Sequence, residues 1–443
     1  MRTTHLGSPK LELSSLTQNS GPYTMKNCLY KLLLCGFALV LFGSTSLTAQ
    51  TYQLLLKGGH VIDPKNGINE PMDVAITGGR IATVAHDIPA AEAERVVDVR
   101  GLYVTPGIID LHTHVFFGTD PHSDQMNGYR SVKPDNFSFK YGITTMVDAG
   151  CAGWRNFELF KEQTIAHSRT RVLAFLRIVG EGARGGVYSQ NIDDMDPKMA
   201  ALTALQHPEI VGFKIAHYDG HDWEPIHRLV EAGEQAGLPV MVDFGSADPP
   251  LPLETLFMEK LRPGDIYTHM YGGGGSGREA ILDEHGRIRS FVPEARRRGI
   301  VFDVGHGSGS LYFAHAIPAI QQGLKPTTIS SDLHQRSANS SMQNMLNVMS
   351  KMLNIGMTLE EVIEASTWQP ARVISRDDLG HLSEGAIADV TVLNVLKGEF
   401  GYVDVDQPPV KVMGDRKLEA ELTVFGGEIV WDLNGRSYDL IKN

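Results

Sequence analysis

The chain has 443 residues, of which 42% are hydrophobic, 21% are charged and 8% are aromatic. This composition excludes a disordered protein, which is poorer in apolar residues, and three cysteines are too few for a disulfide scaffold. The net charge of −12 at pH 7 argues against nucleic acid or an anionic membrane as a partner, because the chain would have to overcome its own field.

Residues 25–49 have the pattern of a secretory signal peptide. Two lysines after Met25 precede an uncharged apolar run over 32–42, and small and polar residues follow it. The run is about half of the roughly 20 residues that a membrane span needs, so no permanent membrane anchor is expected. We predict an exported protein, periplasmic or secreted, with residues 1–24 as an upstream extension. A buried core helix is the alternative interpretation.

Both ends of the remaining chain show short β-strands separated by turn signals. In residues 50–106, the pairs Gly58-Gly59, Asn66-Gly67 and Gly78-Gly79 lie between β-branched runs and predict hairpin turns. A similar pattern returns in residues 381–443. Neither segment is long enough to bury a sheet by itself, so we predict one small composite β-sandwich domain formed from both chain ends.

The middle of the chain, residues 107–380, alternates short apolar runs with helical stretches. Continuous apolar runs are typical of parallel strands that are buried on both faces. Eight such runs predict an α/β fold, a (β/α)₈ TIM-type barrel of ordinary size, with a doubly wound open sheet as the alternative. The runs cover residues 107–111, 144–148, 172–179, 210–215, 239–244, 265–270, 300–304 and 327–331.

A glycine-rich segment follows the third run. Residues 180–185 match the pattern G-x-G-x-x-G of dinucleotide-binding proteins, which raises the alternative of a nicotinamide-dependent oxidoreductase. No clear helix opens at Gly185, and no second strand ends in an acidic residue about 20 positions later, so the context argues against it. We expect a loop over the barrel mouth, where Arg184 meets a substrate carboxylate.

Polar side chains stand at the ends of several apolar runs, where a barrel of this type places its chemistry. His112 and His114 are two residues apart, so on a strand they point to the same side and can share a metal. Each polar residue alone could be a satisfied core group, but together they predict a site. The other polar residues at the ends of these runs are Lys214, His269 and Asp332. We expect His306 and His334 to lie at the barrel mouth and to bind the substrate.

The segment TPGIIDLHTH, with Lys214, His269 and Asp332 following in order, resembles the amidohydrolase superfamily of metal-dependent hydrolases. The segments VDAGCAGWRNF, GDIYTHMYGG, VFDVGHGSGS and TTISSDLH are similar to those of its amidohydrolase/deacetylase metallohydrolases, which are relatives of dihydroorotase. The resemblance covers essentially the whole chain after the signal segment. Cys151, in the first of these segments, is expected to be a packed residue rather than a nucleophile.

The resemblance implies a centre with two divalent metals, zinc or manganese. His112, His114 and Asp332 would bind the first metal, His269 would bind the second, and a carboxylated Lys214 would bridge them. Asp332 would also be the catalytic general base for a metal-bound hydroxide that attacks the substrate carbonyl.

The chain departs from this pattern at the fifth run. Asp243 stands where the family has a histidine ligand. A carboxylate can bind zinc and favours harder metals such as manganese, so Asp243 is a candidate ligand. It also adds a negative charge that a histidine does not carry. The sequence is compatible with three alternatives: a two-metal site, a one-metal site and a non-catalytic barrel.

We therefore predict a metal-dependent amidohydrolase or deacetylase that cleaves an acyl group from a small amide or ester. Cyclic amide hydrolysis, as in dihydroorotase or hydantoinase, is the alternative among enzymes. A barrel that has lost its metal chemistry is the alternative of another class. A homodimer is expected from the family only.

Overall fold

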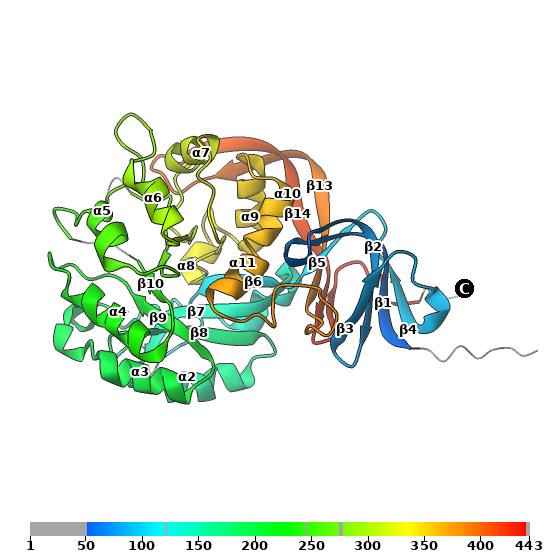
Figure 1. Cartoon of the computed structure of the whole chain (residues 1–443), viewed down its shortest axis with the longest axis horizontal. Coiled ribbons are helices and arrows are strands. Elements are labelled where there is room, and N and C mark those ends of the chain that lie inside the picture. Colours follow the sequence, from blue (N-terminus) through cyan, green and yellow to red (C-terminus); the bar gives the residue numbers. More distant parts are fainter. Residues whose placement is uncertain are drawn as a thin grey trace, which may run out of the picture. The chain divides into compact units, whose positions relative to one another are not determined.

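The structure is a computed structural model that describes residues 51–439, apart from Thr119, Pro121, Phe244, Ser246 and residues 274–277. The predicted signal peptide and the upstream extension lie outside these residues. Within this part of the chain, no helix is long and apolar enough to cross a membrane. The described chain builds one sheet of seven parallel strands and one sheet of eight strands (Figure 1).

The parallel sheet is the barrel predicted for the middle of the chain. Its strands follow one another in chain order, each beside the next. They are β6 (Ile108–Thr113), β7 (Ile143–Gly153), β8 (Arg171–Arg177), β9 (Ile210–Ile215), β10 (Val240–Val242), β11 (Ile266–Tyr267) and β12 (Val301–Phe302).

The eighth run forms no regular strand, which corrects that part of the prediction. It joins β12 through a bridge between Asp303 and Thr328, and β6 through a bridge between Thr113 and Leu333. Backbone hydrogen bonds continue on both sides, such as that from Leu333 N to His112 O at 3.2 Å. The segment therefore closes the barrel without a continuous ladder.

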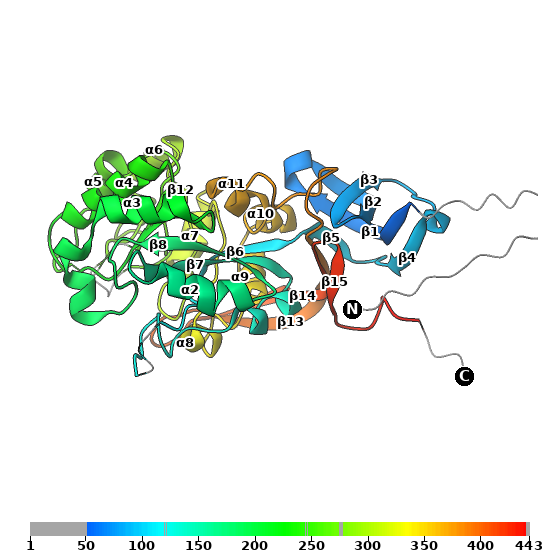
Figure 2. The same cartoon turned by 90° about the horizontal axis from the view of Figure 1, so that it is seen from below.

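The helices lie between and outside the strands of the barrel (Figures 1 and 2). They are α2 (Phe157–Gln163), α3 (Pro197–Gln206), α4 (Glu224–Ala236), α5 (Leu253–Thr255), α6 (Phe291–Arg297), α7 (Phe313–Gln321), α8 (Gln335–Ala338), α9 (Met345–Asn354), α10 (Leu359–Glu364) and α11 (Trp368–Val373). Short 3-10 turns cover Pro64–Asn66, Ala90–Glu92, Pro134–Asn136, Phe139–Tyr141, Ile165–His167, Gly186–Gln190 and Ile192–Asp194, and a π-turn covers Leu256–Lys260. Only a 3-10 turn follows Gly185, which agrees with the argument against a dinucleotide fold.

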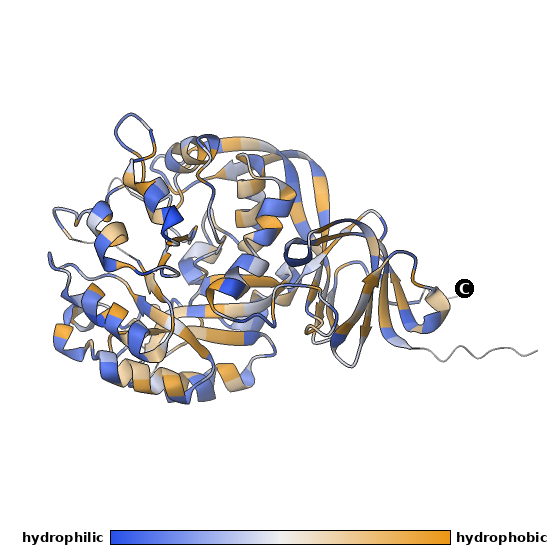
Figure 3. Ribbon diagram, in the orientation of Figure 1, coloured by the Kyte–Doolittle hydropathy of each residue, from blue (hydrophilic) through white to orange (hydrophobic). Residues whose placement is uncertain are grey.

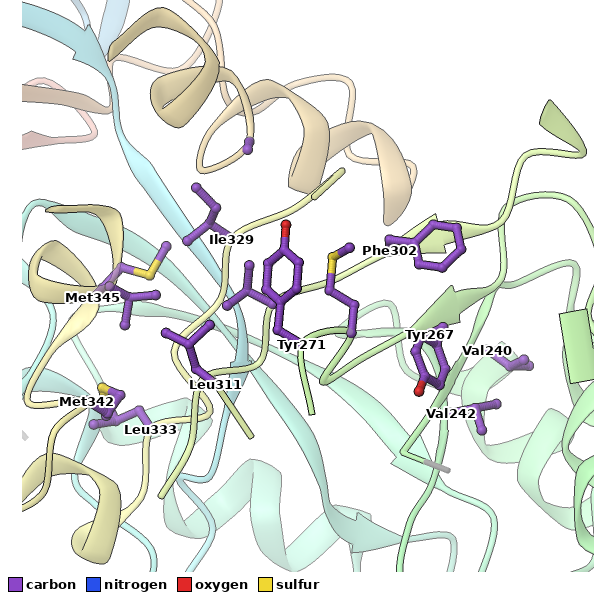
Figure 4. Close-up of a cluster of buried hydrophobic side chains, with 14 of the residues drawn as sticks. Val240, Val242, Tyr267, Tyr271, Phe302, Leu311, Ile329, Leu333, Met342 and Met345 are labelled. Carbon is purple, nitrogen blue, oxygen red and sulfur yellow. The ribbon is translucent and has the colours of Figure 1, made fainter. Parts of the chain in front are cut away.

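The barrel strands are buried on both sides, which explains their continuous apolar sequence. On β10, Val240 and Val242 pack into the large cluster between strands and helices, whereas Met241 packs into a separate cluster with Ile266 and Val301. Figure 4 shows part of the large cluster, with Val240 and Val242 near Tyr267. In Figure 3 the ribbon of the barrel strands is mostly in the colour of hydrophobic residues, whereas hydrophilic and hydrophobic residues alternate along the helices. The barrel interior is thus packed, and only its mouth is available for chemistry.

The second sheet joins both ends of the chain, as the sequence predicts. Its order is β15-β14-β13-β5-β1-β2-β3, with β4 paired to β1. The N-terminal strands are β1 (Tyr52–Asp63), β2 (Ile68–Thr77), β3 (Arg80–Ala85), β4 (Ala93–Asp98) and β5 (Tyr103–Pro106), and the C-terminal strands are β13 (Val390–Val403), β14 (Lys411–Phe425) and β15 (Glu428–Asp432). The ladder between β5 and β13 connects the two halves, and β5 then leads directly into β6.

One of the three predicted hairpin turns is wrong. Gly67 and the pair Gly78-Gly79 do connect neighbouring strands. The pair Gly58-Gly59 instead lies inside β1, where the register with β2 shifts between Leu56 and Gly59. A Cβ on Gly59 would lie 2.5 Å from a methyl carbon of Val104, so close packing against β5 requires a glycine here. The pair is therefore a bulge rather than a turn.

Candidate metal centre

Most of the polar residues predicted at the strand ends line one cavity at the carboxyl ends of the barrel strands. Its volume is about 330 Å³. The side chains that line it include His112, His114, Arg130, Arg177, Lys214, His217, Asp243, His269, Arg278, Asp332 and His334. Most of these side chains are buried, so a ligand in this cavity is bound by groups that are removed from bulk water.

The hydrogen bonds of His112 fix which ring nitrogen faces the cavity. Its Nδ1 lies 3.1 Å from Thr268 Oγ1, and that hydroxyl donates its own proton to Asp303 Oδ2 at 2.7 Å. Thr268 can therefore only accept from His112, so Nδ1 carries the ring proton. Burial, together with the charge of Lys214, lowers the pKa of His112 well below its ordinary value. The ring is neutral, and its Nε2 offers a lone pair.

His114 and His269 also direct Nδ1 to a hydrogen-bond acceptor, each through a different partner. His269 Nδ1 lies 2.5 Å from the carbonyl oxygen of Gly305, which can only accept a proton. His114 Nδ1 lies 3.1 Å from Cys151 Sγ, and this thiol donates to the carbonyl of Met126 at 3.0 Å. Burial raises the pKa of the Cys151 thiol well above its ordinary value, so it is a partner of His114 and not a nucleophile. Three imidazoles thus present Nε2 lone pairs, which is the arrangement of metal-binding histidines.

His112, His114 and Asp332 form a compact group that could hold a metal ion. Asp332 Oδ1 lies 3.0 Å from His114 Nε2 and 3.5 Å from His112 Nε2. Two ligands bound to zinc at 2.0–2.1 Å in a tetrahedron are about 3.4 Å apart, so the spacing fits such an ion. Burial alone would raise the pKa of Asp332, but the adjacent histidines hold it well below its ordinary value. The carboxylate is therefore ionised.

Lys214 is a buried amine beside this group. Its Nζ lies 3.3 Å from His112 Nε2 and 3.3 Å from Met241 Sδ, and no described carboxylate forms an ion pair with it. Burial lowers the pKa of this amine to about 8. A buried lysine without an ion pair is costly, and an ammonium cannot bind a metal, so the unmodified amine has hydrogen-bond partners here but no ion pair with a described carboxylate.

Asp243 lines the same cavity, at the position where the family pattern has a ligand of the second metal. Its Oδ1 accepts a hydrogen bond from Arg278, and both side chains are less than a tenth exposed. Its Oδ2 faces His269 Nε2 at 3.6 Å and His217 Nε2 at 4.0 Å. Burial alone would raise the pKa of Asp243, but His269 and Arg278 hold it well below its ordinary value.

His334 presents a hydrogen-bond donor, and not a lone pair, to the cavity. Its Nδ1 accepts hydrogen bonds from the backbone N–H groups of Arg336 and Ser337 at 3.2 and 3.3 Å, because His334 caps the start of α8. Burial lowers the pKa of His334 to about 4, so the ring is neutral and its proton is on Nε2. His334 therefore offers a hydrogen-bond donor to the cavity and no lone pair for a metal.

Two residues expected to bind substrate do not line the cavity. His306 is fully buried, with Nδ1 2.9 Å from the carbonyl of Gly307 and Nε2 accepting from Lys351 Nζ at 2.6 Å. Both ring nitrogens are occupied, because the chain turns at Gly305 and Gly307 and directs this side chain into the protein. Arg184 pairs with Glu181 at 3.1 Å outside the cavity wall.

The sequence prediction missed the arginines and His217. Arg130, Arg177 and Arg278 line the cavity, and the Nε atom of each is buried without a partner among the described residues. No periodic signal marks Arg130 or Arg278, because both lie in loops. Arg177 ends the third barrel strand and His217 follows the fourth, so the rule that placed the other residues could have found these two.

Comparisons with known proteins find relatives that cover most of this chain. The family model described as "Amidohydrolase family" matches residues 310–430. A deacetylase from Agrobacterium fabrum is 33% identical over 381 residues, which cover 83% of this chain and 88% of the relative.

Two solved structures are similar over nearly their whole length. An adenine deaminase has a TM-score of 0.77 and 27% identity, and the match covers 86% of this chain and 100% of that chain. A dihydroorotase has a TM-score of 0.74 and 30% identity, with 86% and 99% covered. The barrel with its accompanying sheet is therefore a shared architecture.

Proposed function

The chain belongs to the amidohydrolase family, and we propose that it is a metal-dependent hydrolase that removes an acyl group from a small amide or ester. The observation that carries this proposal is the protonation pattern of the cavity histidines. His112, His114 and His269 each donate from Nδ1 to a fixed partner and direct an Nε2 lone pair into the cavity beside ionised carboxylates. The deacetylase at 33% identity supports the acyl substrate.

His112, His114 and Asp332 would hold the first divalent metal, and His269 with Asp243 would contribute to a second. We infer zinc, with manganese as the alternative, because imidazole and carboxylate groups suit both ions. A bound ion of this kind lowers the pKa of water from 15.7 to about 7 and polarises a carbonyl oxygen.

Lys214 would bridge the two metals after carboxylation. The neutral amine attacks carbon dioxide, a nitrogen–carbon bond forms and one proton leaves, which gives a carbamate anion with two oxygens. Support comes from the place of Nζ, which is buried 3.3 Å from His112 Nε2 without an anionic partner among the described residues. Carboxylation would convert an uncompensated buried cation into an anionic ligand.

Asp332 is the residue best placed to move protons. Its Oδ1 contacts the two first-site histidines, and the side chain also lines the cavity in which a substrate would lie. As a carboxylate, it can take a proton from the attacking water and pass it to the leaving nitrogen or oxygen. His334 Nε2–H can donate a hydrogen bond to the substrate from the neighbouring wall.

Purified protein treated with a chelator and then with zinc tests this function. A panel of N-acyl amino acids, O-acyl hydroxy acids and cyclic imides should contain at least one compound whose hydrolysis disappears with the metal and returns with zinc. If the zinc-loaded protein hydrolyses none of them, the proposal is wrong and the barrel is a non-catalytic scaffold.

Cyclic amide hydrolysis is the second candidate, because the dihydroorotase structure covers 86% of this chain at 30% identity. The same panel separates the two candidates, since opening of a cyclic imide gives one product that carries both a new carboxylate and a new amide, whereas removal of an acyl group gives two separate products. Exclusive activity on the cyclic imides would replace acyl removal as the function.

We also propose that the protein is exported through cleavage after residues 25–49, and that it forms a homodimer. The charged start and apolar run of the segment support export. The N-terminal sequence of the protein recovered from the periplasm or medium tests it, and a start well upstream of Gln50 would contradict it. Light scattering of the purified protein tests the dimer.

A further inference from the structure

We propose that Arg177 is the counter-ion of Lys214, and that its guanidinium stabilises the carbamate that forms when carbon dioxide reacts with this amine. This inference rests on the proposed function, in which Lys214 is carboxylated. It assigns a role to Arg177, which the sequence prediction did not include. Arg177 acts through Lys214 in this role, so it is a positioning residue.

The two side chains enter the cavity from neighbouring strands. Arg177 ends β8, and its partner in the ladder between β8 and β9 is Lys214. Partners in a ladder point to the same face of a sheet, and both side chains line the cavity. A Cβ on Gly150, in β7, would lie 2.9 Å from Lys214 Cβ and 3.5 Å from Arg177 Cβ. This glycine therefore leaves room for the two side chains to lie beside each other.

The charges of the two side chains make this arrangement unfavourable without an anion. Arg177 is 2% exposed and Lys214 is 1% exposed. A guanidinium keeps its charge in proteins, and no described carboxylate forms an ion pair with either side chain. A protonated Lys214 would place a second buried cation beside the first, and the repulsion between like charges is strong where water is excluded.

Arg177 differs in this respect from the other two arginines that line the cavity. Arg278 forms an ion pair with Asp243. Arg130 forms one with Asp124 at 3.3 Å. Arg177 is therefore the cavity arginine whose charge is not paired with a carboxylate among the described residues, and an anion beside it would remove the imbalance.

Carboxylation of Lys214 reverses the sign of its contact with Arg177. The neutral amine attacks the carbon of carbon dioxide, a nitrogen–carbon bond forms, an electron pair moves to oxygen and one proton leaves to solvent. The guanidinium then lies beside an anion. Its Nη2 donates to the carbonyl of Ala216 and to Ser189 Oγ, whereas its Nε is buried without a partner among the described residues. A carbamate oxygen is an acceptor that would satisfy this unused N–H group.

The test is the bicarbonate concentration at which the zinc-loaded protein is half carboxylated, measured by carbon NMR with isotopically labelled bicarbonate. The native chain should show a carbamate signal that Lys214→Met lacks. Arg177→Met should need about tenfold more bicarbonate, because a hydrogen bond between charged groups contributes about this factor to an equilibrium. Arg177→Lys keeps the charge and should recover part of the loss. Arg228→Met, on the outer helix α4, is the matched control and should behave like the native chain.

Urea unfolding gives a second readout that does not depend on hydrolysis. The folded chain favours the carbamate in this account, so bicarbonate should raise the unfolding midpoint of the native chain. It should raise the midpoint of Arg177→Met less, and it should leave that of Lys214→Met unchanged. Arg177→Gln, which keeps a donor but no charge, serves in both experiments if Arg177→Met does not fold.

Equal bicarbonate requirements of the native chain and Arg177→Met would overturn the inference. A raised KM of Arg177→Met at native carboxylation would overturn it too, because Arg177 would then bind the substrate. Hydrolysis by a native chain without a carbamate signal would overturn the inference and leave the proposed function standing. A carbamate signal that depends on Arg177, in a chain that hydrolyses no compound of the panel, would support the inference and contradict the proposed function.

Discussion

At the scale of single residues, the centre depends on where each imidazole keeps its proton. Thr268, Cys151 and the carbonyl of Gly305 each accept from Nδ1 of one candidate ligand. The backbone N–H groups at α8 do the opposite for His334 and place its proton on Nε2. Four of the five histidines that line the cavity therefore present two different groups to it, three an Nε2 lone pair and one an N–H donor, and the hydrogen-bond partner of each Nδ1 decides which.

The first prediction at this scale concerns the proton-transfer residue. Asp332→Asn should lower kcat by about 10²–10⁴-fold on the best substrate of the panel, because a general base of this kind contributes that much. Steady-state kinetics on protein of known zinc content measures the effect. The variant should keep its first metal in part, through His112 and His114. Activity within a few-fold of the native chain would show that Asp332 is not the base.

The second prediction concerns the glycine beside Asp332. A Cβ on Gly307 would lie 2.3 Å from Asp332 Oδ2, and its φ of 55° is itself unfavourable for other residues. Gly307→Ala should therefore lower the free energy of unfolding by about 1–3 kcal/mol and weaken zinc binding. Gly309→Ala is the matched control, because a Cβ there meets nothing within 4 Å. Equal unfolding midpoints and zinc affinities for the two variants would contradict the argument.

At the scale of elements, the parallel strands made the site partly predictable. Their carboxyl ends meet at one edge, so a polar residue at each end predicted a common site before any contact was known. Arg278 could not be found in this way, since it lies outside the strands and its sequence context carries no signal for its position. His306 was misplaced because the turns at Gly305 and Gly307, and not the strand, set its direction. The prediction of a hairpin turn at Gly58-Gly59 was wrong because glycine is typical of both β-bulges and hairpin turns.

The third prediction concerns a buried lysine that joins three elements. Lys351 of α9 donates to the carbonyls of Ser341 and Val403 and to His306, and burial lowers its pKa from 10.5 to about 7. Between these values the unfolded chain binds more protons, so the free energy of unfolding should rise with pH, by at most about 1.4 kcal/mol per unit. Below pH 7 the Lys351 amine is protonated in both the folded and the unfolded chain, so it no longer makes the free energy of unfolding depend on pH.

Urea unfolding at pH 7 to 10 measures this contribution when the native chain is compared with Lys351→Met. The variant should lack this part of the slope, because it has no amine to protonate. Other groups that titrate in the same pH range are present in both chains, so their effect cancels when the two free energies of unfolding are subtracted. Parallel pH dependences for both chains would contradict the assignment.

At the scale of the whole molecule, the described chain ends are part of the same fold as the barrel. The sheet made from both ends joins the barrel through β5 and through an ion pair between Arg171, at the start of β8, and Asp389. Arg171 also lies over the ring of Phe425 at 5.1 Å. The composite sheet was predictable from its strand pattern, whereas this ion pair was not, because its residues are 218 positions apart.

The fourth prediction tests that connection. Arg171→Met should lower the free energy of unfolding by about 3–5 kcal/mol, because Asp389 is left buried without its partner. Arg171→Met/Asp389→Asn should recover part of the loss, since the amide oxygen can still accept from the backbone of Gly426. Urea unfolding of the three chains measures both effects. A loss below about 0.5 kcal/mol in the single variant would show that the pair does not couple sheet and barrel.

We propose that the cavity at the barrel mouth performs metal-dependent hydrolysis. The most direct measurement is the rate of hydrolysis of the acyl and cyclic substrates by chelator-treated protein as zinc is returned. We expect no hydrolysis without metal, and a rate that rises with added zinc until every metal site is occupied. A rate that does not change with chelation and zinc, or no hydrolysis by the zinc-loaded protein, would contradict it.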